Sequence, residues 1–266
     1  MKTVLTLTQF PCEDCATGLT NYPMRVFPDK SLEPQRLYRQ IAIQIQDLIK
    51  SGRFAVGSRL PAERDLATQL SVSRPSVREA LIALEVEGVI EVRTGSGIYV
   101  KSLGQRPPSK SNALNMLAEW GPLEVMSARF FIEAEMAALA AIHASSSDLK
   151  AMAEALKAMQ KDAKAGRIPR DSDIAFHMSI ANACANSVMQ DTLKLYLQAR
   201  KGPLFERLAD YFESPASWAS AIAEHEEVFA AIQAHDSKRA RKTMQKHLRQ
   251  AHKRFSASWR SAPSRT

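Results

Sequence analysis

Residues 60–81 read LPAERDLATQLSVSRPSVREAL, and this stretch decides the fold of the N-terminal part of the chain. The pattern predicts two short helices joined by a tight turn. A proline suits the first turn of the first helix, where its missing N–H has no partner in any case. Residues Ser71-Val72-Ser73 break the pattern of the first helix, and Ser73 is placed to cap the second helix. On that helix Arg74 and Arg78 lie one turn apart and share a face.

The residues after this stretch predict a β-hairpin. Gly88 ends the second helix, residues 89–93 form a first strand, residues 94–97 a polar tip, and residues 98–100 a second strand. A helix over residues 36–51 precedes the pair. Three helices followed by a hairpin indicate a winged helix-turn-helix, which reads DNA. The alternative is a small α+β domain whose arginines only solvate its surface.

The same residues resemble the DNA-binding domain of the GntR family of bacterial repressors. The motifs are LPAER at residues 60–64, SRPSVREA at 73–80 and EVEG at 85–88, and the resemblance runs from about Arg36 to Val100. It implies that residues of the two helices and of the wing tip contact an operator. These are Arg64, Ser73, Arg74, Pro75 and Arg78 from the helices, and Thr94, Gly95 and Ser96 from the wing.

Length and composition favour a two-domain protein of the cytoplasm. The chain has 266 residues, of which 45% are hydrophobic, enough for two packed cores. Because no run of about 18 apolar residues occurs, we expect no membrane span. We expect no signal peptide, since Lys2 is followed by a short mixed stretch. Cys12, Cys15 and Cys184 are too few for a disulfide framework.

The net charge of +8 is concentrated at the C-terminal end of the chain. Residues 1–105 carry 13 basic and 11 acidic side chains, whereas the segment from Asp236 onward carries ten basic and one acidic. We interpret this segment as a helix with a solvated basic face. A secondary electrostatic role near DNA is the alternative.

The pattern along the chain predicts four segments. Residues 1–31 form a flexible extension, 32–101 the winged helix-turn-helix, 102–111 a proline-containing linker, and 112–260 an all-helical domain. Breakers in the last segment predict helices over 122–144, 148–165, 171–184, 187–212, 216–235 and 237–258. Gly202 and Pro203 are expected to break or kink the fourth of these. The fold class is therefore mainly α, a winged helix-turn-helix followed by an all-α bundle.

Three histidines occupy apolar helix faces in the predicted bundle: His177, His225 and His247. Asp173 lies one turn before the first of them. The other two are each 11 residues from Asp236, the turn between the last two helices, so an antiparallel pair puts both imidazoles at one height. Buried polar groups need partners, and a shared metal would supply one. One carboxylate and three imidazoles suit a divalent ion such as Zn²⁺ or Ni²⁺ better than Mg²⁺ or Ca²⁺.

These four residues fall on positions of a second pattern, the helical effector domain of the fatty-acid-regulator branch of the GntR family. That resemblance implies a metal with coordination positions open to a carboxylate effector. Arg129 matches an arginine that meets this carboxylate; alternatively, it only pairs with Glu133 one turn on. Further segments look most like hexuronate-responsive members, including Arg36-Leu-Tyr and Gly121-Pro-Leu-Glu124. The effector is therefore expected to be a sugar acid or hydroxy acid.

We predict a DNA-binding transcriptional regulator, acting as a homodimer on a palindromic operator and not as an enzyme. Two alternatives stay open from the sequence. One is a constitutive DNA-binding protein with a structural metal. The other is a metalloenzyme, because an open position on such a metal activates water. Against the enzyme, Glu226 and Glu227 point off the face that carries His225.

Overall fold

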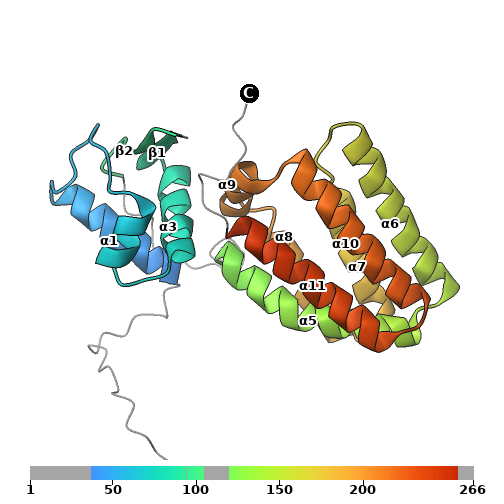
Figure 1. Ribbon diagram of the computed structural model, residues 1–266. Coiled ribbons are helices and arrows are strands. Elements are labelled where there is room, and N and C mark those ends of the chain that lie inside the picture. Colours follow the sequence, from blue (N-terminus) through green and yellow to red (C-terminus); the bar gives the residue numbers. More distant parts are fainter. Residues whose placement is uncertain (1–36, 94, 105–119, 257–266) are drawn as a thin grey trace, which may run out of the picture. The chain divides into compact units, whose positions relative to one another are not determined.

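The computed structural model describes residues 37–93, 95–104 and 120–256, and the chain is mainly helical (Figure 1). Its N-terminal part is the winged helix-turn-helix that the sequence predicts. The elements are α1 (Leu37–Lys50), α2 (Glu63–Gln69), α3 (Arg74–Val86), β1 (Ile90–Arg93) and β2 (Gly97–Val100). The predicted extension 1–31 and most of the predicted linker 102–111 lie outside the described residues.

The turn between α2 and α3 is built by serines. Ser71 has a left-handed backbone with φ of 54°. The Ser73 hydroxyl caps α3 by accepting a hydrogen bond from the backbone N–H of Ser76 at 3.2 Å. Val77 and Leu81 of α3 are fully buried against α1 and α2. The capped turn therefore fixes the direction of α3 relative to the small core beneath it.

The wing is a two-stranded antiparallel sheet. Ile90 pairs with Val100 and Arg93 with Gly97. Ile90, Ile98 and Val100 are buried in the same core as α3. Alternate side chains of a strand point to opposite faces, so the hairpin packs one face on the helices and leaves the other to solvent.

Seven helices follow, with bounds close to the predicted ones. They are α5 (Pro122–His143), α6 (Ser146–Lys164), α7 (Arg170–Ala183), α8 (Ser187–Ala199), α9 (Pro203–Phe212), α10 (Pro215–Gln233) and α11 (Ser237–Phe255). The break predicted at Gly202 and Pro203 separates α8 from α9 completely. The predicted fold class is confirmed. No helix within the described ranges is long and apolar enough to cross a membrane.

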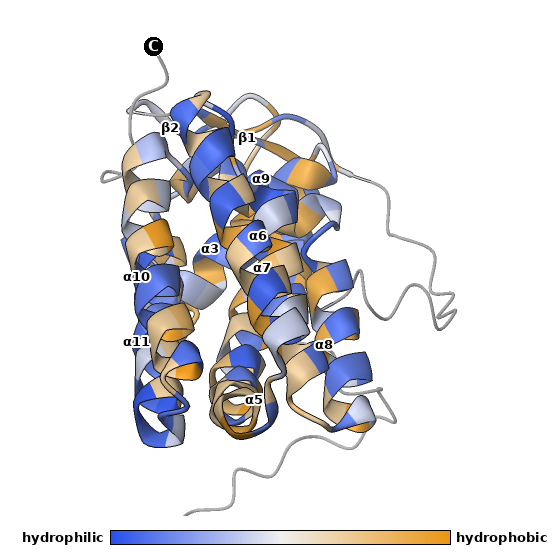
Figure 2. Ribbon diagram, turned by 90° about the vertical axis from the view of Figure 1, so that its right-hand side faces the viewer, coloured by the Kyte–Doolittle hydropathy of each residue, from blue (hydrophilic) through white to orange (hydrophobic). Residues whose placement is uncertain are grey.

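The bundle encloses one large core. Helix α11 packs along α5 and α10, and α6 packs on α7 and α10 (Figure 1). Figure 2 shows an apolar and a polar side on the same helices. Phe176, Met152 and Met159 are fully buried at the centre. The helix faces that carry the histidines of interest are therefore surrounded by apolar side chains.

Helix α9 contacts the last turn of α3 through a polar cluster. Arg207 donates two hydrogen bonds to the Glu85 carboxylate, at 2.8 and 3.0 Å, and the Tyr211 hydroxyl donates another at 2.8 Å. Ile82 of α3 packs in one apolar cluster with Leu208 beside these groups. All of these residues belong to the single compact unit of residues 35–266.

Candidate metal and effector site

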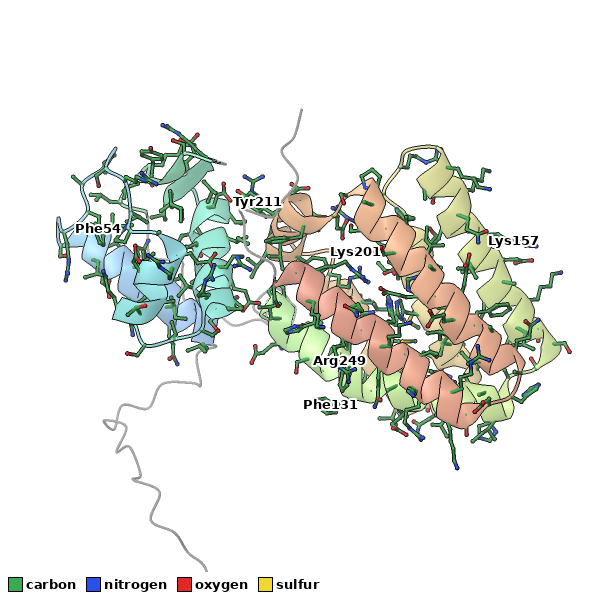
Figure 3. All side chains as sticks on the ribbon, in the orientation of Figure 1. Phe54, Phe131, Lys157, Lys201, Tyr211 and Arg249 are labelled. Atoms are coloured by element: carbon green, nitrogen blue, oxygen red, sulfur yellow. The ribbon has the colours of Figure 1, made fainter. Side chains whose placement is uncertain are left out.

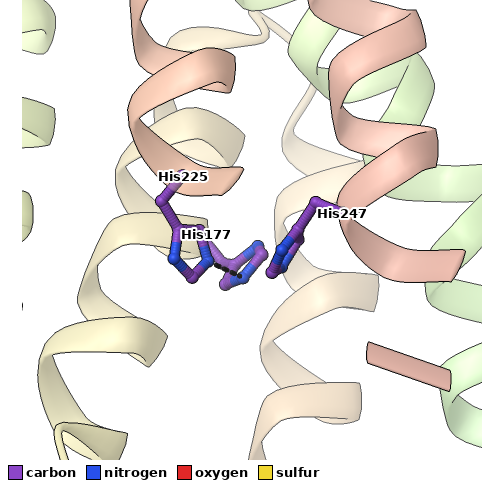
Figure 4. Close-up of side chains that lie close together, drawn as sticks. All are labelled: His177, His225 and His247. Carbon is purple, nitrogen blue, oxygen red and sulfur yellow. Dashed lines mark hydrogen bonds between the residues drawn. The ribbon is translucent and has the colours of Figure 1, made fainter. Parts of the chain in front are cut away.

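Three buried imidazoles meet in the centre of the bundle (Figure 4). His177 comes from α7, His225 from α10 and His247 from α11. One ring nitrogen of each lies within 4.8 Å of the corresponding atoms of the others. The Nε2 atoms of His177 and His225 are 3.2 Å apart, and the ring centroids of His225 and His247 are 4.2 Å apart. At most 4% of each side chain is exposed.

Asp173 joins this group from one turn earlier on α7. Its Oδ1 atom is 3.3 Å from Nε2 of His225 and 3.6 Å from Nε2 of His177. Metal–ligand bonds of about 2.0–2.1 Å in a tetrahedral site put neighbouring ligand atoms about 3.3 Å apart. The donor atoms of Asp173, His177 and His225 are therefore spaced as ligands of one ion. A set of three imidazoles and one carboxylate fits Zn²⁺ or Ni²⁺.

Two glutamates lie next to the Nδ1 atoms of His177 and His247, and the sequence analysis did not predict these contacts. Nδ1 of His177 is 2.5 Å from Oε2 of Glu133 on α5. Nδ1 of His247 is 2.9 Å from Oε2 of Glu224 on α10, and Arg254 donates to both oxygens of that carboxylate. A carboxylate on Nδ1 fixes the tautomer in which Nε2 carries the free lone pair. His247, whose Nδ1 bonds to Glu224, is thus oriented to present Nε2 as a ligand atom. Nδ1 of His177 and Oε2 of Glu133 lie close together but have no hydrogen-bond partner among the described residues.

The charges of the site favour ionised carboxylates and a neutral His225, whereas Glu133 and Asp173 outweigh burial and raise the pKa of His177. Burial opposes ionisation of Asp173, but Arg200 and His177 outweigh it and hold the pKa well below the ordinary value. Burial likewise opposes ionisation of Glu133, and Arg129 and His177 still lower its pKa to about 2. Burial lowers the pKa of His225 well below the usual 6.5, and the neighbouring His247 lowers it further. A neutral imidazole next to a carboxylate is the state in which both bind a metal.

Arg129 forms the ion pair that was one of its two predicted roles, and it also keeps an N–H group free for the other, which is binding of an anion. It is 4% exposed and forms the expected ion pair with Glu133 one turn on. Its Nη2 atom is buried without a hydrogen-bond partner in the described part of the chain. A buried N–H group with no acceptor costs stability, so this N–H group could donate to an anion that enters the cavity.

Arg200 is a site residue that sequence reasoning missed. It lies at the C-terminal end of α8, and its Nη1 atom donates to Oδ2 of Asp173 at 2.6 Å. Arg129, Arg200, Asp173 and His177 line a common cavity of about 50 Å³ in the bundle. The break before α9 ends α8 at Arg200. The local sequence does not indicate that the Arg200 side chain points into the bundle.

The residues predicted to contact DNA occupy different environments. Arg64 and Arg74 are largely exposed, with 80% and 50% of their side chains accessible. Arg78 is buried: it donates from Nε and Nη2 to the Glu63 carboxylate at 2.9 and 2.7 Å. The Arg78 guanidinium also lies 5.6 Å from the centre of the Phe212 ring. A contact from Arg78 to DNA therefore requires these interactions to open.

The remaining predicted contacts are near the helix cap and the wing. Ser73 is exposed and Pro75 half-buried at the start of α3. Gly95 and Ser96 are exposed at the tip of the hairpin. Thr94 lies outside the described residues.

A winged helix-turn-helix followed by a helical bundle with a buried polar centre defines a DNA-binding regulator with an effector domain. Residues 37–100 match the model of bacterial regulatory proteins of the gntR family, and residues 124–250 match the FCD domain. The chain belongs to the GntR family of transcriptional regulators, and its bundle is an FCD domain.

Curated relatives match over most of the chain. The Exu regulon transcriptional regulator of Escherichia coli K12 is 36% identical over 221 residues, which cover 81% of this chain and 83% of the relative. The Uxu operon transcriptional regulator of the same strain is 32% identical over 224 residues, covering 83% and 87%. A solved structure of a GntR protein from Streptococcus agalactiae is 24% identical, with a TM-score of 0.43, and covers 81% of this chain and 99% of that one.

Proposed function

We propose that this chain is a repressor whose operator affinity is controlled by a small sugar acid bound at a metal centre in the FCD domain. The metal ligands are Asp173, His177, His225 and His247. The observation that carries the proposal is that His177, His225 and His247 each bring one ring nitrogen within 4.8 Å of the others. Asp173 and Arg129 line the cavity beside them, and one buried Arg129 nitrogen has no hydrogen-bond partner in the described part of the chain. The resident ion, Zn²⁺ or Ni²⁺, supplies a Lewis-acidic position for a carboxylate and an adjacent hydroxyl.

The protein's own groups complete effector binding. The free Nη2 of Arg129 donates to the effector carboxylate, and such charge-assisted hydrogen bonds are about twice as strong as neutral ones. Glu133 and Glu224 hold the imidazoles in place. The relatives named above carry Exu and Uxu in their names, in agreement with the hexuronate-like segments of this sequence, so we take a hexuronate as the first effector to test.

On the DNA side, we propose that Arg64 and Arg74 contact the operator first, with Ser73, Pro75, Gly95 and Ser96 beside them and Thr94 from the wing. Arg78 joins them once it leaves Glu63. One winged helix reads few base pairs, so a homodimer on a palindromic operator is the expected assembly. A DNA-binding regulator of this family acts in the cytoplasm, where its operator lies.

The test of the effector site is the His225→Ala variant, with the exposed His143→Ala as its matched control. Wild type, purified without chelator, is expected to carry one divalent ion per chain by mass spectrometry and to lose operator affinity on addition of D-galacturonate or D-glucuronate. His225→Ala is expected to lose both metal and response while it keeps operator binding. A metal-free wild type that still responds fully would overturn the metal-dependent mechanism.

The test of the DNA site is the Arg74→Ala variant. Loss of an arginine that reads a base edge costs roughly 1–3 kcal/mol and relaxes specificity, whereas loss of a phosphate contact weakens all sequences alike. Fluorescence anisotropy against operator and scrambled duplexes separates the two. Undiminished operator binding by the Arg74→Ala, Arg78→Ala double variant would contradict the assignment.

A further inference from the structure

The cavity beside the histidines is too small for the proposed effector as a whole. Its volume of about 50 Å³ leaves room for only a few water molecules. A second cavity of about 350 Å³ adjoins it. The two have Arg200, Phe205, Glu213 and Phe255 in common in their linings. The space that a six-carbon acid needs is therefore available beyond these four shared side chains, next to the cavity at the histidines.

The lining of the second cavity is polar and balanced in charge. Three cationic and three anionic side chains lie around it over an apolar floor of Ile168, Ile174, Phe205 and Ala209. The cations are Arg170, Arg200 and Lys201, and the anions are Asp171, Glu206 and Glu213. The cationic side chains donate hydrogen bonds and the anionic ones accept them. Such a mixed lining suits hydroxyl groups, each of which both donates and accepts. A second carboxylate would meet the three anionic groups and gain no net attraction.

Two of these polar groups are free to exchange partners at little cost. Nζ of Lys201 is 3.9 Å from Oδ1 of Asp171, and 65% and 96% of the two side chains are exposed. Exposed pairs of this kind contribute little stability. Arg170 is held more firmly, because its Nε donates to Glu213 at 2.7 Å. Lys201 is thus the side chain most readily turned toward a ligand.

We propose that the effector's carboxylate end lies at the histidine centre while its hydroxyl-bearing tail occupies the second cavity. This assignment rests on the proposed function and adds a selectivity to it. The site takes six-carbon monocarboxylic sugar acids in preference to three-carbon hydroxy acids, which leave the second cavity empty. Arg200, which bonds Asp173 and lies on the boundary, positions the middle of the ligand.

The experiment uses two variants of the full-length, metal-loaded protein. Ala209→Leu adds three carbons to a buried α9 residue that lines the second cavity. Lys201→Ala removes an exposed donor at its rim, and Lys157→Ala, an exposed lysine on α6, is the matched control (Figure 3). Calorimetry measures binding of D-galacturonate, L-lactate and galactarate, the dicarboxylate of galacturonate's length. Metal content is measured on the same samples.

Ala209→Leu is expected to weaken galacturonate binding about tenfold or more, and Lys201→Ala about fivefold, the loss of one charge-assisted hydrogen bond. Metal content and lactate binding stay at wild-type levels, and Lys157→Ala changes nothing. Wild type binds galacturonate more tightly than galactarate or lactate. Wild-type galacturonate affinity in both cavity variants, or a preference for galactarate, would overturn the placement of the tail alone. A wild type that binds no sugar acid would instead overturn the proposed function.

Discussion

At the scale of single residues, the proposed metal centre depends on a carboxylate that is not itself a ligand. Glu224 accepts from Nδ1 of His247 and is held in turn by Arg254, whose guanidinium donates at 2.8 and 3.0 Å. Burial opposes ionisation of Glu224, but His247 and Arg254 lower its pKa to about 2. It is therefore negatively charged at neutral pH and favours the His247 tautomer in which Nε2 carries the free lone pair.

Glu224→Gln is expected to weaken metal binding about tenfold, because an amide holds the His247 tautomer less strongly than a carboxylate does. Competition with a calibrated zinc chelator gives the affinity. Glu227→Gln is the control, since this exposed residue on the same helix pairs only with Lys246 among the described residues. Equal zinc affinity in Glu224→Gln and wild type would show that the carboxylate has no orienting role.

Glu79 on α3 is expected to make the free energy of unfolding depend on pH. Burial raises its pKa to about 7, against the opposing effect of the Leu123 backbone N–H that donates to it at 2.7 Å. Between about pH 4.5 and 7 the folded chain keeps a proton that the unfolded chain has lost. The free energy of unfolding therefore falls as the pH rises through this range and levels off above it.

Glu79→Gln removes this loss, since an amide does not ionise. The variant is expected to gain on the order of 2–3 kcal/mol relative to wild type on going from pH 5 to pH 8. Urea unfolding at both pH values gives the difference, with the exposed Glu91→Gln as control. Parallel pH profiles for Glu79→Gln and wild type would mean that Glu79 is ionised in the folded protein.

The residues of the site were only partly readable from the sequence. Asp173, His177, His225 and His247 could be proposed because helical periodicity marks a polar residue on an apolar face. Glu133 and Arg200 could not, because their inward direction comes from how α5 and α8 pack against α7. Periodicity describes one helix at a time. The Glu133–His177 contact joins residues 44 positions apart, and the Asp173–Arg200 contact joins residues 27 positions apart.

At the scale of elements, caps and breakers set the position of each functional side chain. Ser214 and Ser217 form a reciprocal capping box at the start of α10, which carries His225. Gly202 and Pro203 end α8 and begin α9, so Arg200 comes to the end of its helix. These signals are local in sequence, and for that reason the helix bounds were predicted to within a few residues.

Ser214→Ala is expected to lower the stability of the fold by about 1 kcal/mol, the usual cost of losing an N-cap. Ser220→Ala is the control: its hydroxyl lies on the same helix and, among the described residues, donates to the backbone oxygen of Ala216 at 3.2 Å. Thermal unfolding of the metal-free proteins measures both. A loss from Ser220→Ala as large as that from Ser214→Ala would contradict the capping role.

At the scale of the whole molecule, α9 contacts both the cavity beside the histidines and α3. Phe205 and Phe212 of α9 line the cavity beside His177 and His247. Arg207 and Tyr211 of the same helix hold Glu85 at the end of α3. A ligand that prefers one position of α9 will therefore favour one state of α3 as well. The sequence indicated a linked pair of domains and a helix in this region, but not its contact with α3, because that contact joins residues more than 120 positions apart.

Breaking the polar contact between α9 and Glu85 of α3 tests this connection. The Arg207→Gln, Tyr211→Phe double variant breaks the polar contact from the α9 side and leaves α3 intact. We expect its operator affinity without effector to stay within a few-fold of wild type, and its response to galacturonate to fall. A tenfold response in wild type corresponds to about 1.4 kcal/mol of coupling, which is within the range of the two or three charge-assisted hydrogen bonds removed. Operator titrations with and without effector give the coupling directly.

Arg241→Gln is the control, since this arginine pairs with Glu135 on the bundle surface. Full coupling in the double variant, with metal and effector bound as in wild type, would exclude α9 as the connecting element.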